Sequence, residues 1–270
     1  MSIELAIALR RLENERRTGV LRVGDGAFHF TDGVIASADC RRATTLDRLA
    51  VEAGVATEEG WQRAEAGDTG RLLHKPQLET LAVLSVYDAA YFLLASPAVP
   101  EFRPAPPHWL APICHITPHA LLEECARRGD PQAGPWPVDL VDRAPVIPVR
   151  RIHRKRLSLT GGQVEVLAAA DTRRSVTGIA RDLGRTTYGC LIAVRELTTA
   201  GLIELPVATP VSIKTAEPMV IEPVTPTPAA GIPPLRRRVR AAVAAPAADH
   251  WQPLDPDVLV RVRAALEGLA

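Results

Sequence analysis

The chain has 270 residues, of which 47% are hydrophobic, and its 32 Lys and Arg against 31 Asp and Glu give a formal net charge of +1. The length favours about two domains, and the composition excludes wholesale disorder and a uniformly basic or acidic protein. The longest apolar stretch, residues 81–96, is too short for a membrane span and contains Asp88, so we expect no contact with a membrane.

Motifs that would indicate secretion or catalysis are missing from the sequence. The first residues are charged where a secretory signal needs an apolar region, which favours a cytoplasmic location. The four cysteines are scattered without a C-x-x-C pair, a pattern typical of reduced thiols. There is no Walker A loop, no H-E-x-x-H and no G-x-S-x-G, so we expect neither an enzyme nor a bound cofactor.

From the N-terminus, the pattern first predicts a helix. Ser2 is a suitable N-cap, and an apolar stripe at helical spacing runs to about Arg17, formed by Ile3, Ile7 and Leu12 with Leu5 and Leu9 beside them. Three short strands follow, separated by the turn dipeptides Asp25-Gly26 and Asp32-Gly33, because Asp-Gly is a strong hairpin signal. Helices are then expected over 44–53, 57–66 and 77–95. This order predicts a small α+β domain.

Residues 1–125 resemble the PatA-like N-terminal domain of bacterial signalling proteins. The resemblance is carried by Gly19-Val20-Leu21-Arg22-Val23, by Phe28-His29-Phe30-Thr31-Asp32-Gly33-Val34-Ile35 and by Ala38. Domains of that family lie beside receivers, DNA-binding modules and other signalling parts. The resemblance therefore implies a signalling or interaction module, and it implies no enzymatic activity.

Proline and charge mark where this module ends. Twelve of the 24 prolines lie within 97–148 and eleven within 206–256, which leaves 1–96 and 149–205 for regular structure. Residues 1–148 carry a net charge of −5 and residues 149–205 a net charge of +5. An acidic module is thus joined to a basic one, with 126–156 as the connecting segment. Such asymmetry indicates a part that faces a polyanion.

Residues 157–205 predict a second module of three helices and a strand. Thr160, Ser175 and Thr186 are suitable N-caps, and Gly184 and Gly201 follow the second and third helices. The order helix, helix, short turn, helix, A-G-L-I-E-L resembles the winged helix-turn-helix of bacterial transcription regulators. That resemblance implies contact with duplex DNA through the third helix.

The third helix offers two interpretations. Its core face should carry Cys190, Val194 and Leu197, which leaves a second face with Thr187, Tyr188, Leu191, Ile192 and Arg195. In the DNA-binding interpretation, Thr187, Tyr188 and Arg195 contact the groove. Aliphatic side chains read base edges poorly, so in the other interpretation Leu191 and Ile192 form an interface with another domain or subunit.

A basic run precedes this module and is the strongest cue for a polyanion. It consists of Arg150, Arg151, Arg154, Lys155 and Arg156. Because each neutralised phosphate releases counterions, such a run could supply most of the affinity for nucleic acid. The alternative is a solvated linker whose charges face the acidic N-terminal module.

A metal site is not expected at the cluster of Cys114, His115, His119 and Cys125. Although the two histidines are four residues apart, Thr117 and Pro118 indicate that a helix begins between them, so the rings should point apart.

Proline, alanine and threonine dominate residues 206–250, which predicts an extended tether with polyproline-II character. Residues 251–270 predict an amphipathic helix with Leu259, Val262 and Leu266 on its apolar side and Trp251 as an anchor. Such a helix needs a groove, on its own protein, a second copy or a partner.

The sequence therefore favours a regulatory protein that binds duplex DNA through a winged helix and the adjacent basic run. The alternative is a scaffold or signalling adaptor whose winged helix binds a protein partner or a second copy in a homodimer.

Overall fold

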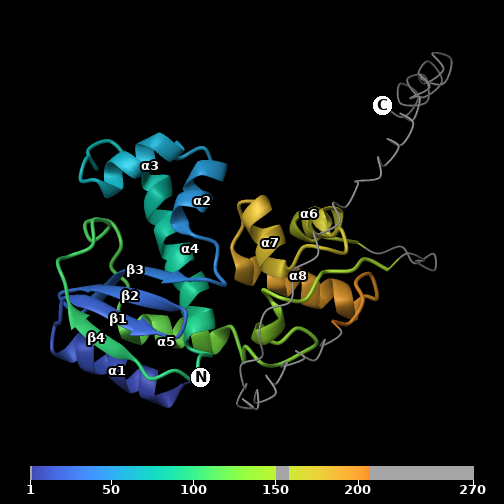
Figure 1. Cartoon of the computed structure of the whole chain (residues 1–270), viewed down its shortest axis with the longest axis horizontal. Helices are drawn as coiled ribbons and strands as arrows, with labels where there is room; N and C mark the ends of the chain where they lie inside the picture. The colour runs from blue at the N-terminus through green and yellow to red at the C-terminus, as the bar shows by residue number, and fades with distance from the viewer. Residues whose placement is uncertain (1, 150–157, 207–270) are drawn as a thin grey trace, which may run out of the picture. The chain divides into compact units, whose positions relative to one another are not determined.

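The computed structural model describes residues 2–149 and 158–206, drawn in colour in Figure 1. These residues form eight α-helices, one 3-10 helix and one four-stranded antiparallel sheet, which confirms a mixed helix-and-sheet fold. The elements are, in chain order, α1 (Ile3–Asn14), β1 (Gly19–Val23), β2 (Gly26–Thr31), β3 (Val34–Cys40), α2 (Leu46–Glu52), α3 (Glu58–Glu65), α4 (Pro76–Leu93), β4 (Glu101–Pro104), α5 (Pro118–Arg127), η1 (Val138–Leu140), α6 (Gly161–Ala169), α7 (Val176–Asp182) and α8 (Thr187–Thr199).

The sheet has the strand order β3-β2-β1-β4. The expected Asp32-Gly33 turn is confirmed, since both residues have positive φ and Thr31 pairs with Val34. The expected Asp25-Gly26 turn is wrong by one residue, because Gly24, at φ +57°, opens the turn and Gly26 already pairs with Val23. The sequence pattern did not predict β4, which lies at the edge of the sheet, where a strand tolerates proline.

The helix starts follow the expected caps. Ser2, Thr117, Ser175 and Thr186 each accept a hydrogen bond from a backbone amide three residues ahead, and Thr160 forms a capping box with Gln163. The expected face of α1 needs correction. Leu5, Leu9 and Leu12 are buried, whereas Ile3 and Ile7 are 76% and 62% exposed.

One hydrophobic core runs through both halves of the described chain. Helix α4 packs on β2 and β3 and also contacts α2, α5 and α8. The core extends from Leu5 in α1 to Leu202 and Ile203 after α8 without a break. The described residues accordingly form one compact unit, so the two modules that the sequence predicts share their core.

The C-terminal half is a trihelical unit closed by short β-bridges. Pro145 pairs with Ser175 and Pro148 pairs with Ile203, so the segment before α6 lies between the start of α7 and the end of α8. Helices α6 and α7 both pack on α8 (Figure 1). The expected 202–205 strand is reduced to this bridge among the described residues.

Among the helices of the described ranges, none combines the length and the apolarity that a membrane crossing requires. The expected tether at 206–250 lies outside the described residues except for Pro206, and the expected helix at 251–270 lies outside them entirely.

Candidate functional site

Helix α8 is buried on two faces. Cys190, Val194 and Leu197 lie in the core of the trihelical unit, which confirms the predicted inner face. On the other face, Thr187 and Leu191 are also fully buried. Helix α4 of the N-terminal half supplies part of the cover of these buried faces. A third face of α8 is not covered, since Gly189, Glu196 and Thr199 are exposed there.

The first backbone amides of α8 donate hydrogen bonds to the carboxylate of Asp88 in α4. Its Oδ1 accepts the amide of Tyr188 at 2.7 Å, and its Oδ2 accepts the amides of Thr187 at 2.9 Å and Thr44 at 3.4 Å. Helix amides and a carboxylate attract each other because the helix dipole is positive at this end. Burial nevertheless raises the pKa of Asp88 to about 6, against the opposing effect of these hydrogen bonds.

Arg195, two turns along α8, binds the N-terminal half through its whole guanidinium. It donates to the carbonyl of Trp136 at 2.8 Å, to that of Pro131 at 3.0 Å and to the hydroxyl of Tyr91 at 3.3 Å. The Trp136 side chain is fully buried and donates to Thr198 at 3.0 Å. Because four of the five N–H donors of Arg195 have acceptors in the protein, the guanidinium would have to give up these bonds to contact a base edge or a phosphate.

The three tyrosines of the chain meet beside this contact. The ring of Tyr188 lies 4.8 Å from that of Tyr91, and the guanidinium of Arg128 stands 4.4 Å from Tyr188 and 5.4 Å from Tyr87. Such cation–π contacts are strongest where water is excluded. Burial raises the pKa of the Tyr188 hydroxyl. We call the contact of α8 with Asp88, Tyr91, Arg128 and Trp136 the α8 seam.

The α8 seam corrects the expected DNA contacts of this helix. Thr187, Tyr188 and Arg195 face the N-terminal half of the same chain, so in this structure they present no groove-reading surface. Leu191 is fully buried in the core of the chain, and Ile192 is half-buried. The interface with another domain or subunit that the alternative interpretation expected stays a prediction. The other predicted site residues, Arg150, Arg151, Arg154, Lys155, Arg156, Trp251, Leu259, Val262 and Leu266, lie outside the described residues.

A cavity of about 260 Å³ adjoins the α8 seam. Thr44 lines this cavity and also bonds through its hydroxyl to the hydroxyl of Thr187 at 3.3 Å. Its walls come from the sheet, from α2, α3 and α4, and from the loop before α5. We call it the His29 cavity; it is lined by His29, Ser37, Ala38, Asp39, Cys40, Ala43, Thr44, Thr45, Leu46, Asp47, Trp61, Glu65, Ser85, His108, Trp109 and Leu110.

Two histidines and a carboxylate meet in the His29 cavity. The Nε2 of His29 lies 3.2 Å from Asp39, and the His29 and His108 rings are 4.8 Å apart. The Nδ1 of His108 accepts the amide of Leu110 at 3.2 Å, which leaves its Nε2 as the donor of a neutral ring. Burial and the neighbouring His29 lower the pKa of His108 to about 4. Burial raises the pKa of the Cys40 thiol to about 12, so this cysteine is not a nucleophile.

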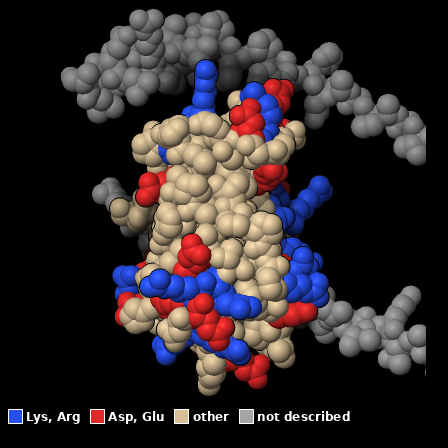
Figure 2. Space-filling model, turned by 90° about the vertical axis from the view of Figure 1, so that its left-hand side faces the viewer, with Lys and Arg blue, Asp and Glu red and all other residues tan. Residues whose placement is uncertain are grey.

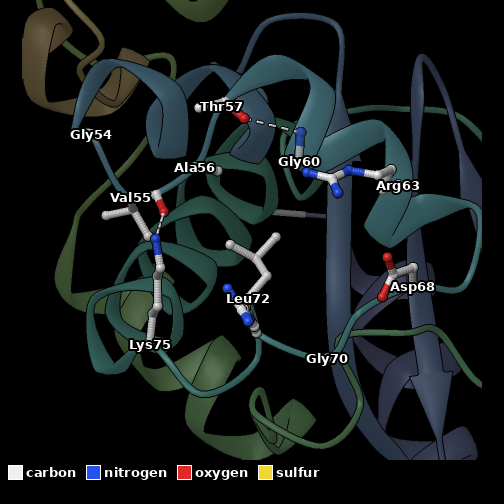
Figure 3. Close-up of a pocket in the computed structure, with 11 residues that line it drawn as sticks. Gly54, Val55, Ala56, Thr57, Gly60, Arg63, Asp68, Gly70, Leu72 and Lys75 are labelled. Atoms are coloured by element: carbon white, nitrogen blue, oxygen red, sulfur yellow. Dashed lines mark hydrogen bonds between the residues drawn. The ribbon is translucent and has the colours of Figure 1, made fainter.

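A larger hollow of about 530 Å³ lies between α3 and the start of α4. Figure 3 shows Lys75 reaching the carbonyl of Val55 and Thr57 accepting the amide of Gly60. Arg63 donates to its own helix at the carbonyl of Glu59. The side chains of Thr57, Arg63 and Lys75 are therefore engaged in local structure, and the charged residues of this hollow lie on the exposed surface.

The cluster considered for a metal is dispersed. Cys114 and Cys125 are buried in the core as free thiols, and His115 is exposed. His119 lies on the surface 3.3 Å from Glu123. Among the residues that the structure describes, no group of three or more His, Cys, Asp or Glu could hold a metal ion.

Figure 2 shows the side of the molecule that lies at the left of Figure 1. Charges of both signs mix over its lower part, and the area above them is largely uncharged. The loop of residues 104–117 lies on this side and contains no Asp, Glu, Lys or Arg. The described part of this face therefore offers no continuous positive band for a phosphate backbone.

Comparisons with protein-family models, with curated proteins and with solved structures find no match for this chain. The resemblances to a PatA-like domain and to a winged helix-turn-helix thus stay predictions from the sequence pattern.

Sequence reasoning missed His29, Asp39, His108 and the capping role of Asp88. A signal for Asp88 existed, because a carboxylate inside an apolar helix must find donors when that helix is buried. The histidines carried no such signal, since one lies in a hairpin and the other in a proline-rich loop.

Proposed function

We propose that this chain is a non-enzymatic regulatory adaptor in which the helix-turn-helix serves as a protein interface. The observation that supports this most strongly is the α8 seam, where the N-terminal half covers Thr187, Tyr188 and Arg195, the residues that the sequence pattern assigned to the groove. In helix-turn-helix proteins the first residues of that helix contact base edges. Here those residues, Thr187 and Tyr188, are bound to Asp88.

Electrostatics also supports the adaptor. The group nearest the start of α8 is a carboxylate, and a phosphate approaching the same amides would have to replace Asp88 and lose its three hydrogen bonds. The cation that the sequence assigned to DNA, Arg195, is held by two carbonyls and a hydroxyl. Reading a groove through α8 would require the α8 seam to open.

A selection from a random-sequence duplex pool at ~50 mM salt tests the adaptor against a sequence reader. The full chain should enrich no motif, because the first residues of α8, which would contact base edges, are bound to Asp88. An enriched motif whose binding is lost in Ile192→Asp, a half-buried position of α8, would overturn the proposal. A second measurement uses the full chain as bait in nuclease-treated lysate of its host. Specific protein partners should survive the nuclease, and loss of every partner would contradict an adaptor.

A second candidate function, non-specific binding of duplex DNA, is favoured by the basic run of Arg150, Arg151, Arg154, Lys155 and Arg156. If all five cations contact phosphates, the logarithm of the binding constant should fall with the logarithm of salt at a slope of about −4.5. Replacing the five by Gln should abolish that slope. Arg236→Gln, Arg237→Gln, Arg238→Gln and Arg240→Gln form the matched control, and an unchanged slope in the first variant would rule out this candidate.

A further inference from the structure

We propose that the His29 cavity binds a small organic cation that carries an aromatic ring, such as an aromatic ammonium. This site is independent of the adaptor function, because it rests on the cavity and its side chains and not on what α8 contacts.

The size of the cavity fits one ring and a short chain. At about 260 Å³ it exceeds the roughly 150 Å³ that accommodates benzene in an engineered protein cavity. The volume therefore matches one ring with a short chain as the part of the ligand that the cavity holds.

The charge of the lining selects a cation. Asp39, Asp47 and Glu65 line the cavity, and no Lys or Arg does. The carboxylate of Asp39 lies within hydrogen-bond distance of His29, and the carboxylate of Glu65 accepts the indole N–H of Trp61 at 2.8 Å. Within the described residues, Asp47 has neither an ion pair nor a hydrogen bond, so its carboxylate is open to a ligand. An anion placed here would face three carboxylates without a compensating cation.

Aromatic side chains form part of the wall beside these carboxylates. Trp61 and Trp109 lie edge to face, with ring centroids 5.1 Å apart and planes at 74°. The ring of His108 stacks on Trp109 at 6.0 Å. Indole faces attract cations and pack against aromatic rings, and a wall of this kind beside carboxylates is the chemistry by which proteins recognise organic ammonium groups.

A buried hydroxyl is aimed at the same space. Ser85, in the middle of α4, lines the cavity and is 4% exposed, yet its hydroxyl has no hydrogen-bond partner among the described residues. Buried polar groups in native proteins are nearly always satisfied by protein, water or ligand. Because Ser85 lines the cavity, its hydroxyl is placed to exchange a hydrogen bond with a ligand there.

The experiment is a calorimetric titration of the full chain with 2-phenylethylammonium, and with 2-phenylethanol and phenylacetate as neutral and anionic controls of similar shape. We expect saturable binding of the ammonium with a Kd below ~1 mM and binding of both controls at least roughly tenfold weaker.

Variants connect that binding to the cavity. Asp47→Asn should weaken the binding of 2-phenylethylammonium roughly tenfold, and Ser85→Ala should weaken it roughly threefold, because each substitution removes one polar contact. Asp68→Asn, a carboxylate of the larger hollow, is the matched control and should leave the Kd unchanged. Asp47 is exposed, so its variant should keep the fold.

Three results would each overturn the proposal: no binding of the ammonium, equal binding of 2-phenylethanol or phenylacetate, or an unchanged Kd in Asp47→Asn. If Ser85→Ala unfolds the chain, the titration of Asp47→Asn still decides.

Discussion

Asp88 and Tyr188, a hundred residues apart in the sequence, are joined by a 2.7 Å hydrogen bond from the backbone amide of Tyr188 to a carboxylate that is fully buried. This bond fixes the start of α8 on the middle of α4, and with it the C-terminal half on the N-terminal half. A buried carboxylate is costly unless donors surround it, so its presence indicates that the α8 seam is a specified contact.

Asp88→Ala should therefore destabilise the chain by about 2–5 kcal/mol, because the amides of Thr44, Thr187 and Tyr188 lose their acceptor inside the protein. The measurement is urea unfolding followed by circular dichroism. Asp68→Ala, an exposed carboxylate, should change the free energy of unfolding by less than about 0.5 kcal/mol. Equal effects of the two substitutions would show that Asp88 does not hold the seam.

The raised pKa of Asp88 predicts a pH dependence. Its folded-state pKa of about 6 lies above the ordinary 3.8, so the folded state binds the proton more tightly than the unfolded state. Its contribution to stability is present below pH 4 and is lost as the pH rises through 6. The difference in unfolding free energy between wild type and Asp88→Asn should therefore grow in favour of wild type as pH falls from 7 to 5. A difference that shrinks over this range would contradict the assignment.

The lowered pKa of His108 predicts a pH dependence of stability with the opposite sign, over an overlapping range of pH. Its folded-state pKa of about 4 lies below the ordinary 6.5, so the unfolded state takes up the proton first. Its contribution is present above pH 6.5 and is lost as pH falls through 4. Relative to His108→Gln, the wild type should lose stability between pH 7 and pH 5, and a flat difference would show that the ring is not kept neutral by the cavity.

Much of the fold could be predicted because local chemistry decides it. Each expected N-cap among Ser2, Thr117, Ser175 and Thr186 does cap a helix, since a capping hydroxyl needs no distant partner. The Asp32-Gly33 turn also follows from local backbone preference. The face of α1 was less predictable, because Ile3 and Leu5 are equally apolar and their burial depends on where the sheet lies.

The candidate site could not be predicted in the same way, because it depends on contacts between residues that are far apart in the sequence. A regular hairpin from the Asp32-Gly33 turn would pair His29 with Ala36, but the sheet bulges there and His29 pairs with Ser37. The extra residue turns Ser37 and Asp39 to the side of His29, which creates one wall of the cavity. The function of α8 likewise depended on α4, and no pattern within residues 157–205 shows that another part of the chain covers the helix.

Two glycines allow the packing of the turn between α7 and α8 against α2 to be separated from backbone strain. Gly184 and Gly201 both have positive φ, but a Cβ on Gly184 would lie 2.3 Å from the Cβ of Glu52 in α2, whereas one on Gly201 meets open space. Gly201→Ala should cost about 1 kcal/mol of stability through strain alone. Gly184→Ala should cost at least about 1 kcal/mol more, by chemical denaturation. Equal costs would mean that α2 and the turn between α7 and α8 are not in contact in solution.

The hydroxyls of Thr44 and Thr187 lie 3.3 Å apart at fully buried positions, which predicts a specific energetic coupling across the α8 seam. Thr44→Val or Thr187→Val alone leaves the other hydroxyl without its partner, so each should destabilise the chain by about 1–2 kcal/mol. The double variant removes both hydroxyls and should cost less than the sum by roughly 0.5–1.5 kcal/mol. The control pair is Thr44→Val with Thr198→Val, because the Thr198 hydroxyl accepts a hydrogen bond from Trp136 instead. The destabilising effects of these two substitutions should be additive. Additivity in the first pair as well would show that the two hydroxyls do not bond.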